Sequence, residues 1–276
     1  MKKFALGIDI GGSGIKGAIV DLKTGEFATD RVRIPTPQPA TPQAVADVVK
    51  QIVDTFADQL GDGPIGITVP AIVMHGMTRS AANIDPAWVD APAGQIFESL
   101  LGRDITIVND ADAAGVAEVR YGAAKNHPGL VIVTTLGTGI GTALIYDGVL
   151  IPNAELGHIE IGGVNAESMA AASVREREQL SYEEWAKRLD PYYQRLEFLT
   201  SPDLFVVGGG VSKNSDKFLP LLHLKTEIIP AQLRNAAGIV GAAYLAAQRR
   251  AHPDALKDTI PGVPTTKKGA KKASKS

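Results

Sequence analysis

The sequence predicts a duplicated α/β fold whose two halves face each other across a cleft. Two glycine-rich segments carry this prediction. Residues 9–18 read DIGGSGIKGA and residues 136–143 read LGTGIGTA, and the GSGI of the first aligns without a gap to the GTGI of the second. Each segment lies between two apolar runs, which is typical of a β-hairpin with a glycine turn. Similar strands and helices follow each hairpin, and such a repeat indicates two related structural units.

Composition limits the classes of protein to consider. The chain has 276 residues, a length typical of two domains, with 45% hydrophobic residues and a net charge of −2. This charge does not favour a nucleic-acid partner. The sequence contains no cysteine, which excludes disulfides and thiolate metal sites and is consistent with a cytoplasmic protein. Residues 1–3 lead directly into an apolar strand, so we expect neither a signal peptide nor a membrane span.

Hydrophobic periodicity places the elements of the first half. Val45, Val49 and Ile52 recur at helical spacing, whereas residues 65–69 form a short β-branched run that ends at Pro70. The expected elements are strands over 4–10, 15–21 and 27–34, a helix over 42–60, a strand over 65–69, a loop-rich stretch over 71–95, a short helix over 96–101, a strand over 105–108 and a helix over 111–121.

The second half repeats this order. The expected elements are two or three strands within 130–151, helices near 166–179 and 181–199, a strand over 204–207 and a final helix over 239–249 that begins near Gly238.

These elements suggest a division into domains. A small N-terminal domain is expected over 1–108, joined by the returning helix at about 238–250, and a larger domain over 109–237. The tail, 252–276, is rich in lysine and lacks the apolar residues needed to fold, so we expect it to be disordered. Such a tail either solubilises the protein or attracts polyanions.

The glycine turns are candidate phosphate sites, because a tight turn can aim several backbone N–H groups and a hydroxyl at one anion. The alternative is that both turns are purely structural. The recurrence of the same motif in both halves argues against this alternative. A third glycine cluster follows the strand over 204–207 and permits close backbone approach to a ligand. The candidate phosphate-binding residues are Asp9, Gly11, Gly12, Ser13, Gly14, Lys16, Gly137, Thr138, Gly139, Gly209 and Gly210.

Two aspartates stand where strands end. Asp9 opens the first hairpin and is suited to hold Mg²⁺ through water beside phosphates, or else to hydrogen-bond the turn itself. Asp110 follows the strand over 105–108, at the edge of a sheet where ligands bind in α/β folds. A carboxylate there can accept the proton of an attacking hydroxyl. The alternative is that Asp110 or Asp112 only caps the next helix.

Glu155 and His158 follow the second hairpin in the sequence ELGH. A carboxylate and an imidazole are suitable partners for sugar hydroxyls, although a histidine bonded to a nearby carbonyl would look the same. Farther along, several basic side chains either line a path for a polyanion or are plain surface charges. These are Lys213, Lys217, Lys225 and Arg234.

Taken in order, these motifs resemble the ROK family of sugar kinases. The matching segments are DIGGS at 9–13, NDA at 109–111, LGTGIG at 136–141, ELGH at 155–158 and VGGGV at 207–211. The resemblance covers about residues 1–250 and implies an actin-like (ribonuclease H-like, hexokinase-type) fold of two domains around a central cleft. Segments 183–189, 201–205 and 233–242 resemble the branch of the family that uses inorganic polyphosphate.

The resemblance implies transfer of the terminal phosphoryl group of polyphosphate or ATP to the 6-hydroxyl of glucose, with mannose a further substrate. Asp110 would be the general base. The residues that would bind the sugar are Asn83, Asn109, Asp110, Glu155, His158 and Glu167. Mg²⁺, held by Asp9 through water, and a homodimer are also implied. Most members carry a cysteine-rich zinc motif after the ELGH element, but residues 159–180 contain no cysteine, so zinc is not expected.

Three other functions deserve comparison. A strictly ATP-dependent hexose or N-acylhexosamine kinase would share all these motifs. A sugar-responsive transcription regulator of the same family would need a DNA-binding segment before the first strand, where this sequence has only residues 1–3. An actin-like cytoskeletal protein would explain both hairpins but not the ELGH element.

Overall fold

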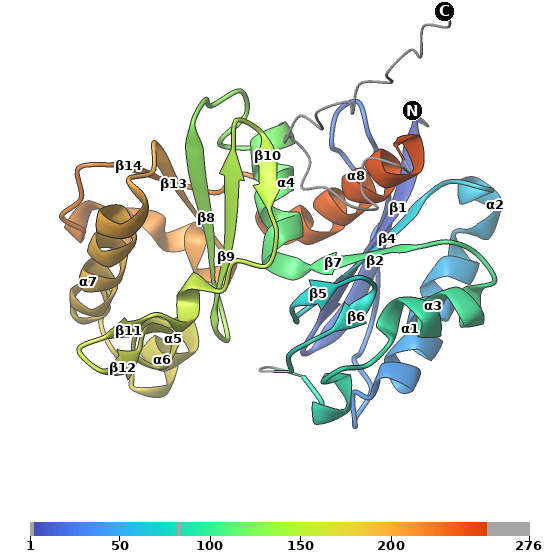
Figure 1. Cartoon of the computed structure of the whole chain (residues 1–276), viewed down its shortest axis with the longest axis horizontal. Helices are drawn as coiled ribbons and strands as arrows, with labels where there is room; N and C mark the ends of the chain where they lie inside the picture. Colours follow the sequence, from blue (N-terminus) through green and yellow to red (C-terminus); the bar gives the residue numbers. More distant parts are fainter. Residues whose placement is uncertain (1–2, 82–83, 253–276) are drawn as a thin grey trace, which may run out of the picture.

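The computed structural model describes residues 3–81 and 84–252. Asn83 and the lysine-rich tail therefore lie outside the described residues. Two five-stranded sheets stand side by side, with helices between them and on their outer faces (Figure 1). Within the described part of the chain, no helix has the length and apolar character needed to cross a membrane.

The first sheet has the strand order β3-β2-β1-β4-β7. Strands β1 and β2 form the first glycine hairpin, and β4 and β7 run parallel to β1. The strand predicted over 27–34 is shorter than expected, because only 32–34 form β3 and Phe27 makes a single bridge to Val20. The bounds are β1 (Phe4–Gly11), β2 (Gly14–Asp21), β3 (Val32–Ile34), β4 (Ile65–Val69) and β7 (Thr106–Asn109).

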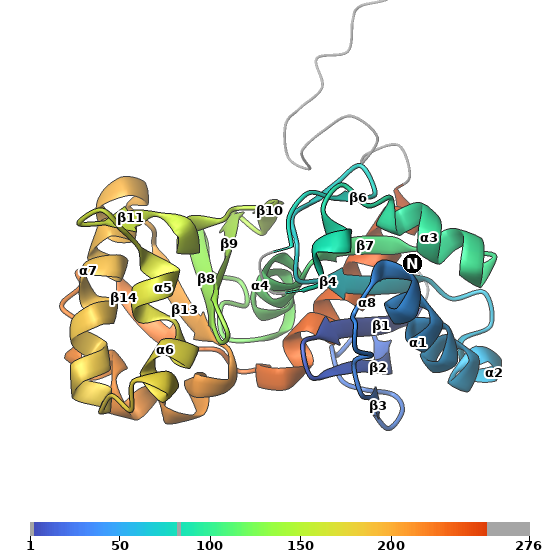
Figure 2. The ribbon, with the colours of Figure 1, turned by 90° about the horizontal axis from the view of Figure 1, so that it is seen from below.

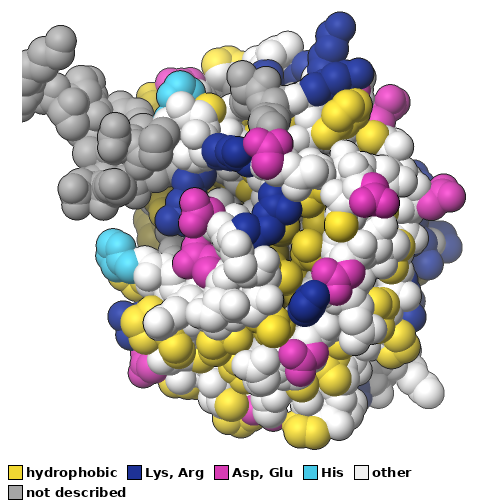
Figure 3. All heavy atoms as spheres, turned by 90° about the vertical axis from the view of Figure 1, so that its right-hand side faces the viewer, with side chains coloured by type: hydrophobic (Ala, Val, Ile, Leu, Met, Phe, Trp, Pro, Cys, Tyr) yellow, Lys and Arg dark blue, Asp and Glu magenta, His cyan; other side chains and the backbone are white. Residues whose placement is uncertain are grey.

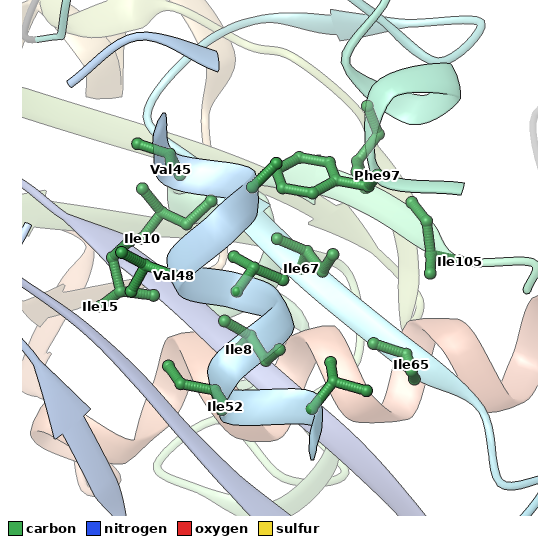
Figure 4. Close-up of a cluster of buried hydrophobic side chains, with 14 of the residues drawn as sticks. Ile8, Ile10, Ile15, Val45, Val48, Ile52, Ile65, Ile67, Phe97 and Ile105 are labelled. Atoms are coloured by element: carbon green, nitrogen blue, oxygen red, sulfur yellow. The ribbon is translucent and has the colours of Figure 1, made fainter. Parts of the chain in front are cut away.

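The outer face of this sheet is covered by α1 (Pro42–Thr55) and α3 (Ala93–Leu101). Figure 4 shows Ile8 and Ile67 of the sheet in one cluster with Ile52 of α1 and Phe97 of α3. All four side chains are fully buried, so the helical spacing in the sequence marks the buried face of α1, as predicted.

The second sheet repeats the pattern with the order β10-β9-β8-β13-β14. Here β8 and β9 form the second glycine hairpin, and β13 and β14 run parallel to β8. The repeat of two antiparallel pairs followed by two parallel pairs confirms the predicted duplication. The bounds are β8 (Leu130–Leu136), β9 (Ile140–Tyr146), β10 (Val149–Ile151), β13 (Leu204–Gly208) and β14 (Glu227–Pro230), the last of which was not predicted.

Several predicted elements are divided or shifted. The helix predicted over 42–60 breaks at Phe56 into α1 and α2 (Ala57–Leu60). The helix predicted over 166–179 breaks at Ala171, whose ψ of 154° is extended, into α5 (Ala166–Ala170) and α6 (Ala172–Arg177). The Trp185 indole of α7 (Tyr182–Thr200) donates to the carbonyl of Ala170, 2.9 Å away, which stabilises the break.

The shorter elements connect these units. Two small hairpins consist of β5 (Val73–Met74) with β6 (Met77–Thr78) and β11 (Glu160–Ile161) with β12 (Val164–Asn165). The 3-10 helices are η1 (Pro86–Trp88), η2 (Leu156–His158), η3 (Gly210–Lys217), η4 (Leu219–Leu221) and η5 (Arg234–Ala236).

Two helices join the halves. Helix α4 (Asp110–Tyr121) follows β7 of the first sheet but packs on β8 and β9 of the second, whereas α8 (Ala237–Ala251) follows the second sheet but packs on β1 and β4 of the first. The two helices also pack against each other (Figures 1 and 2). The contacts are so close that a Cβ on Gly66 would overlap the carbonyl of Ala242, and one on Gly241 would overlap that of Ala113.

We therefore expect Gly66→Ala to destabilise the fold by about 1–3 kcal/mol or more, because α8 would have to move away from β4. Chemical denaturation of both proteins measures this loss. Gly210→Ala is the control, since its Cβ would meet no atom within 4 Å. Equal stability of the two variants would show that the close packing of α8 does not constrain the fold.

Candidate active site

The two glycine turns lie on the same side of the molecule, at the ends of β1–β2 and β8–β9 (Figures 1 and 2). They differ in length. Gly11 pairs with Gly14 and leaves a two-residue turn, whereas Leu136 pairs with Ile140 and leaves a three-residue turn. The gapless alignment of the two motifs therefore does not extend back into the preceding strands.

Close contacts explain two of the glycines. A side chain on Gly14 would overlap the Arg33 guanidinium, whose Nη2 donates to the carbonyl of Ser13 at 2.7 Å. In the second turn, a side chain on Gly139 would overlap the Glu167 carboxylate. Each turn is therefore covered by a charged side chain that the sequence does not place there.

The second turn retains free donors. Glu167 Oε2 accepts from the N–H of Ile140 at 2.7 Å, and Gly137 N donates to Gly139 O. Across the described residues, the N–H groups of Thr138 and Gly139 make no hydrogen bond within the protein. These two amides are thus available to an anion, and Glu167 is tied to the turn through one of its oxygens.

Asp9 is held by two neighbours. Thr68 lies opposite Asp9 in the β1–β4 register and donates its hydroxyl to Asp9 Oδ1 at 2.9 Å. Lys16 Nζ lies 3.5 Å from Asp9 Oδ2. The carboxylate is thereby fixed at the end of β1, with a cation beside it.

Asp110 is the first residue of α4, but it is not the residue that caps the helix. Asn109 is the N-cap, since its Oδ1 accepts from Asp112 N at 3.0 Å while its Nδ2 donates to Ala71 O at 3.2 Å. The alternative that Asp110 or Asp112 caps this helix is therefore wrong. Asn109 already uses both ends of its amide within the protein.

The environment of Asp110 favours its protonated form. Burial, together with the carboxylates of Asp9 and Glu155, raises the pKa of Asp110 to about 7, against the effect of the Ala111 N–H, which donates to it. A carboxyl group with a pKa near neutrality is well matched to general-base chemistry.

Residues of both halves line one cavity, of about 160 Å³, around Asp110. Four of the predicted site residues share it: Asp9, Lys16, Asp110 and Gly209. The further lining residues include Thr135, Arg234, Asn235 and Gly238, none of which except Arg234 was singled out in the sequence. The cavity thus brings Asp110 together with a cation from each half, Lys16 and Arg234, and such cations are suited to bind a phosphate group.

The predicted sugar residues form a second group. Glu155 is the N-cap residue of the short helix η2, and its Oε2 lies 3.8 Å from Nε2 of His158, the last residue of η2. His158 Nδ1 lies 3.2 Å from Asn165 Nδ2. Burial raises the pKa of Glu155, which His158 partly offsets and Glu167 reinforces. Because Glu155 also acts on Asp110, the group lies beside the candidate base.

A polar link between the halves was not anticipated. The side-chain amide of Asn153 pairs with both backbone groups of Val73, at 2.9 Å each, and the N–H of Asn153 donates to Asp112 Oδ2 at 2.8 Å. Burial raises the pKa of Asp112 to about 7. The other oxygen, Asp112 Oδ1, is buried without a hydrogen-bond partner among the described residues. This link holds the segment that leads to Glu155.

The basic residues singled out downstream do not gather at one point. Arg234, with a left-handed φ of 49°, lines the cavity around Asp110, whereas Lys217 lies at the end of η3. Gly209, with φ of 84°, lies against the carbonyl of Leu136, and Gly210 begins η3. The polyanion path therefore cannot be read from spacing alone.

A larger cavity, of about 1080 Å³, contains none of the predicted site residues. It lies where β4 and β7 begin, at the ends opposite to Asp110. Its Arg103 donates to the carbonyls of Gly61 and Gly63, and its Arg250 pairs with Asp62. Figure 3 shows the right-hand side of Figure 1, where basic and acidic side chains are interspersed on the surface. These observations do not favour a second charged-ligand site there.

The donor set for a metal is sparse. Among residues 3–81 and 84–252, no three His, Asp or Glu side chains are arranged to hold a metal ion by themselves. Mg²⁺ in phosphoryl-transfer sites is commonly held by one or two carboxylates together with water and phosphate. Asp9 fits that pattern, and its role toward Mg²⁺ stays a prediction.

The fold and site together describe a two-lobed sugar kinase, and comparison with known proteins gives its family. The ROK family model matches residues 5–173, and the chain belongs to the ROK family.

More specific similarities follow. The chain is 50% identical over 252 residues to a polyphosphate glucokinase of Mycobacterium tuberculosis, covering 91% of this chain and 94% of that protein. It superposes with a TM-score of 0.86 on an inorganic polyphosphate/ATP-glucomannokinase of Arthrobacter sp. strain KM, with 51% identity over 90% of this chain and all of the other.

A ROK family glucokinase of Streptomyces griseus, solved with glucose and AMPPNP, matches with a TM-score of 0.77 and 25% identity over 89% of this chain and 99% of that chain. These neighbours confirm the actin-like, hexokinase-type fold predicted from the sequence.

Asp110 should lower the stability of the fold at neutral pH. Its pKa rises from an ordinary 3.8 to about 7, so its protonated form stabilises the folded protein below pH 4, and that contribution is lost as pH rises toward 7. Asp110→Asn mimics the neutral form. We expect the variant to be more stable than the wild type at pH 8, by up to about 4 kcal/mol, and nearly equal to it at pH 4. Denaturant unfolding at the two pH values measures the difference, and a pH-independent difference would contradict it.

Proposed function

We propose that this protein is a polyphosphate-dependent glucokinase, which transfers the terminal phosphoryl group of inorganic polyphosphate to the 6-hydroxyl of glucose. The observation that carries the proposal is the 50% identity to a polyphosphate glucokinase along nearly the whole chain. The geometry supports it, because a carboxyl group with a raised pKa lines a phosphate-sized cavity and lies near a group of sugar-compatible side chains.

In this proposal Asp110 accepts the proton of the sugar hydroxyl as the oxygen attacks the terminal phosphorus. Lys16 and Arg234, which line the same cavity, stabilise the charge on the transferring phosphoryl group. Glu155 and His158 orient the sugar, with Glu167 on its flank. The amides of Thr138 and Gly139 bind the phosphate donor. Donor and sugar are then held in one complex, and the phosphoryl group is transferred within it.

Mg²⁺, when bound, would neutralise charge on the donor phosphates, and Asp9 would hold it through water. The similarity to a glucomannokinase that uses ATP as well as polyphosphate extends the proposal to ATP and to mannose. The proposal includes a cytoplasmic location, with which the absence of cysteine is consistent, and a homodimer, which rests on the family resemblance.

The donor is tested first. A coupled glucose 6-phosphate assay compares nucleotide-free polyphosphate with ATP in the presence of Mg²⁺. We expect turnover with polyphosphate. Turnover with ATP alone would reject the proposed donor but retain the hexokinase reaction, and activity on N-acetylmannosamine without activity on glucose would favour an acylhexosamine kinase.

The base is tested by Asp110→Asn. We expect kcat to fall by about 10²–10⁴-fold, because the general base is lost, while glucose still binds in calorimetry. The wild-type kcat/KM should rise with pH through about 7 as Asp110 ionises, with a single proton lost. A variant with substantial activity would refute the assignment.

The sugar contact is tested by Glu155→Ala. Removing a hydrogen-bonding carboxylate from the sugar should weaken glucose affinity by about ten-fold or more. The control is Glu160→Ala, two residues beyond His158 and exposed. Glucose affinity equal to that of the wild type would remove Glu155 from the site.

A further inference from the structure

Two basic side chains share one aromatic ring on the second half. The guanidinium carbon of Arg175, on α6, lies 3.8 Å from the centre of the Tyr182 ring, and Lys217 Nζ, at the end of η3, lies 5.4 Å from the same centre. Tyr182 in turn stacks on buried Phe218, with 11° between the ring planes. The ring thus brings cations from two separate segments together.

The two cations, Arg175 and Lys217, are available to bind an anion. Neither cation has a carboxylate within ion-pair distance in the described part of the chain, although α6 carries other charged side chains that do pair. Arg175 Nε is buried and has no hydrogen-bond partner there. A buried donor without a partner costs free energy unless a ligand or water satisfies it.

The helix that carries Arg175 begins against the second glycine turn. Ser173, two residues before Arg175, donates its N–H to Gly137 O at 3.0 Å and its hydroxyl to Thr138 O at 2.6 Å. These bonds fix the start of α6 against the turn. A chain of phosphates whose first units contact the turn would therefore reach Arg175 with its next ones.

The shape of the pair favours a polyanion over a nucleobase. The guanidinium covers a face of Tyr182, so that face is closed to a stacked adenine, while the planar donors of Arg175 match phosphate oxygens. Lys217 is exposed and adds a second positive charge.

We propose that Arg175 and Lys217 form a distal subsite that binds the phosphates of long polyphosphate chains beyond those held at the second glycine turn. The inference rests on the proposed polyphosphate-dependent function. It adds the place where the polyphosphate chain leaves the active site. Its consequence is a preference for long donors over short ones.

The test compares long-chain polyphosphate, tripolyphosphate and ATP as donors for Arg175→Met and Lys217→Met. We expect the KM for long-chain polyphosphate to rise roughly five-fold or more for Arg175→Met and roughly two-fold or more for Lys217→Met. The kcat, the KM for glucose and the KM for the two short donors should stay near wild-type values. The salt dependence of the long-chain KM should become less steep.

Arg177→Met is the matched control, because Arg177 lies on the same helix and pairs with Glu178 at 3.3 Å. An equal rise of the long-chain KM for Arg177→Met would show that the rise comes from the loss of positive charge in general. That result would overturn the proposed subsite. An equal rise of KM for short and long donors, or no rise in either test variant, would also overturn it.

Lys217 is exposed, so Lys217→Met keeps the test valid if Arg175→Met fails to fold. The wild-type enzyme is assayed first. If it phosphorylates glucose with ATP, but polyphosphate neither serves as a donor nor inhibits the reaction, the proposed polyphosphate-dependent function itself is contradicted.

Discussion

The close packing of α8 is the constraint on which the rest of the structure depends. Each connecting helix leaves one sheet and packs on the other, and α4 and α8 meet where Gly241 faces the carbonyl of Ala113. Since Asp110 is the first residue of α4, the position of the candidate base is set by this crossing. Gly66 and Gly7 provide the room on the first sheet, so small residues that do not line the cavity determine the geometry within it.

The site brings together carboxylates whose mutual repulsion lowers the stability of the fold. Asp9 and Glu155 both raise the pKa of Asp110, and burial raises it most. A cluster of this kind destabilises a fold at neutral pH, and such clusters are retained where chemistry requires them. The cations of the same cavity, Lys16 and Arg234, come from opposite halves, so the balance of charge depends on both halves being in place.

The sequence was informative wherever the signal was local. The glycine hairpins, the apolar face of α1 and the position of Asp110 after β7 were all predicted, because each follows from spacing along a short segment. The helix breaks at Phe56 and Ala171 were not, since the Trp185 contact that stabilises the second break comes from the following helix. The overall fold and the family were identified from the order of the motifs.

The contacts that complete the site were largely invisible in the sequence. Arg33 covers the first turn from another strand, and Thr68 reaches Asp9 only because β4 lies beside β1 in one register. The capping role fell to Asn109 rather than to Asp110 or Asp112, since Asx side chains compete for one position and only geometry decides among them. A polar residue in the short apolar strand over 65–69 is the signal that could have found Thr68.

The amide of Asn153 has a consequence of its own. By occupying the N–H and the carbonyl of Val73, a residue of β5, the side-chain amide pairs with a strand as a neighbouring strand would. A pairing made by a single side chain breaks without unzipping its neighbours, because no cooperative register is lost with it. Loss of these two hydrogen bonds would therefore leave the ladders of both five-stranded sheets intact.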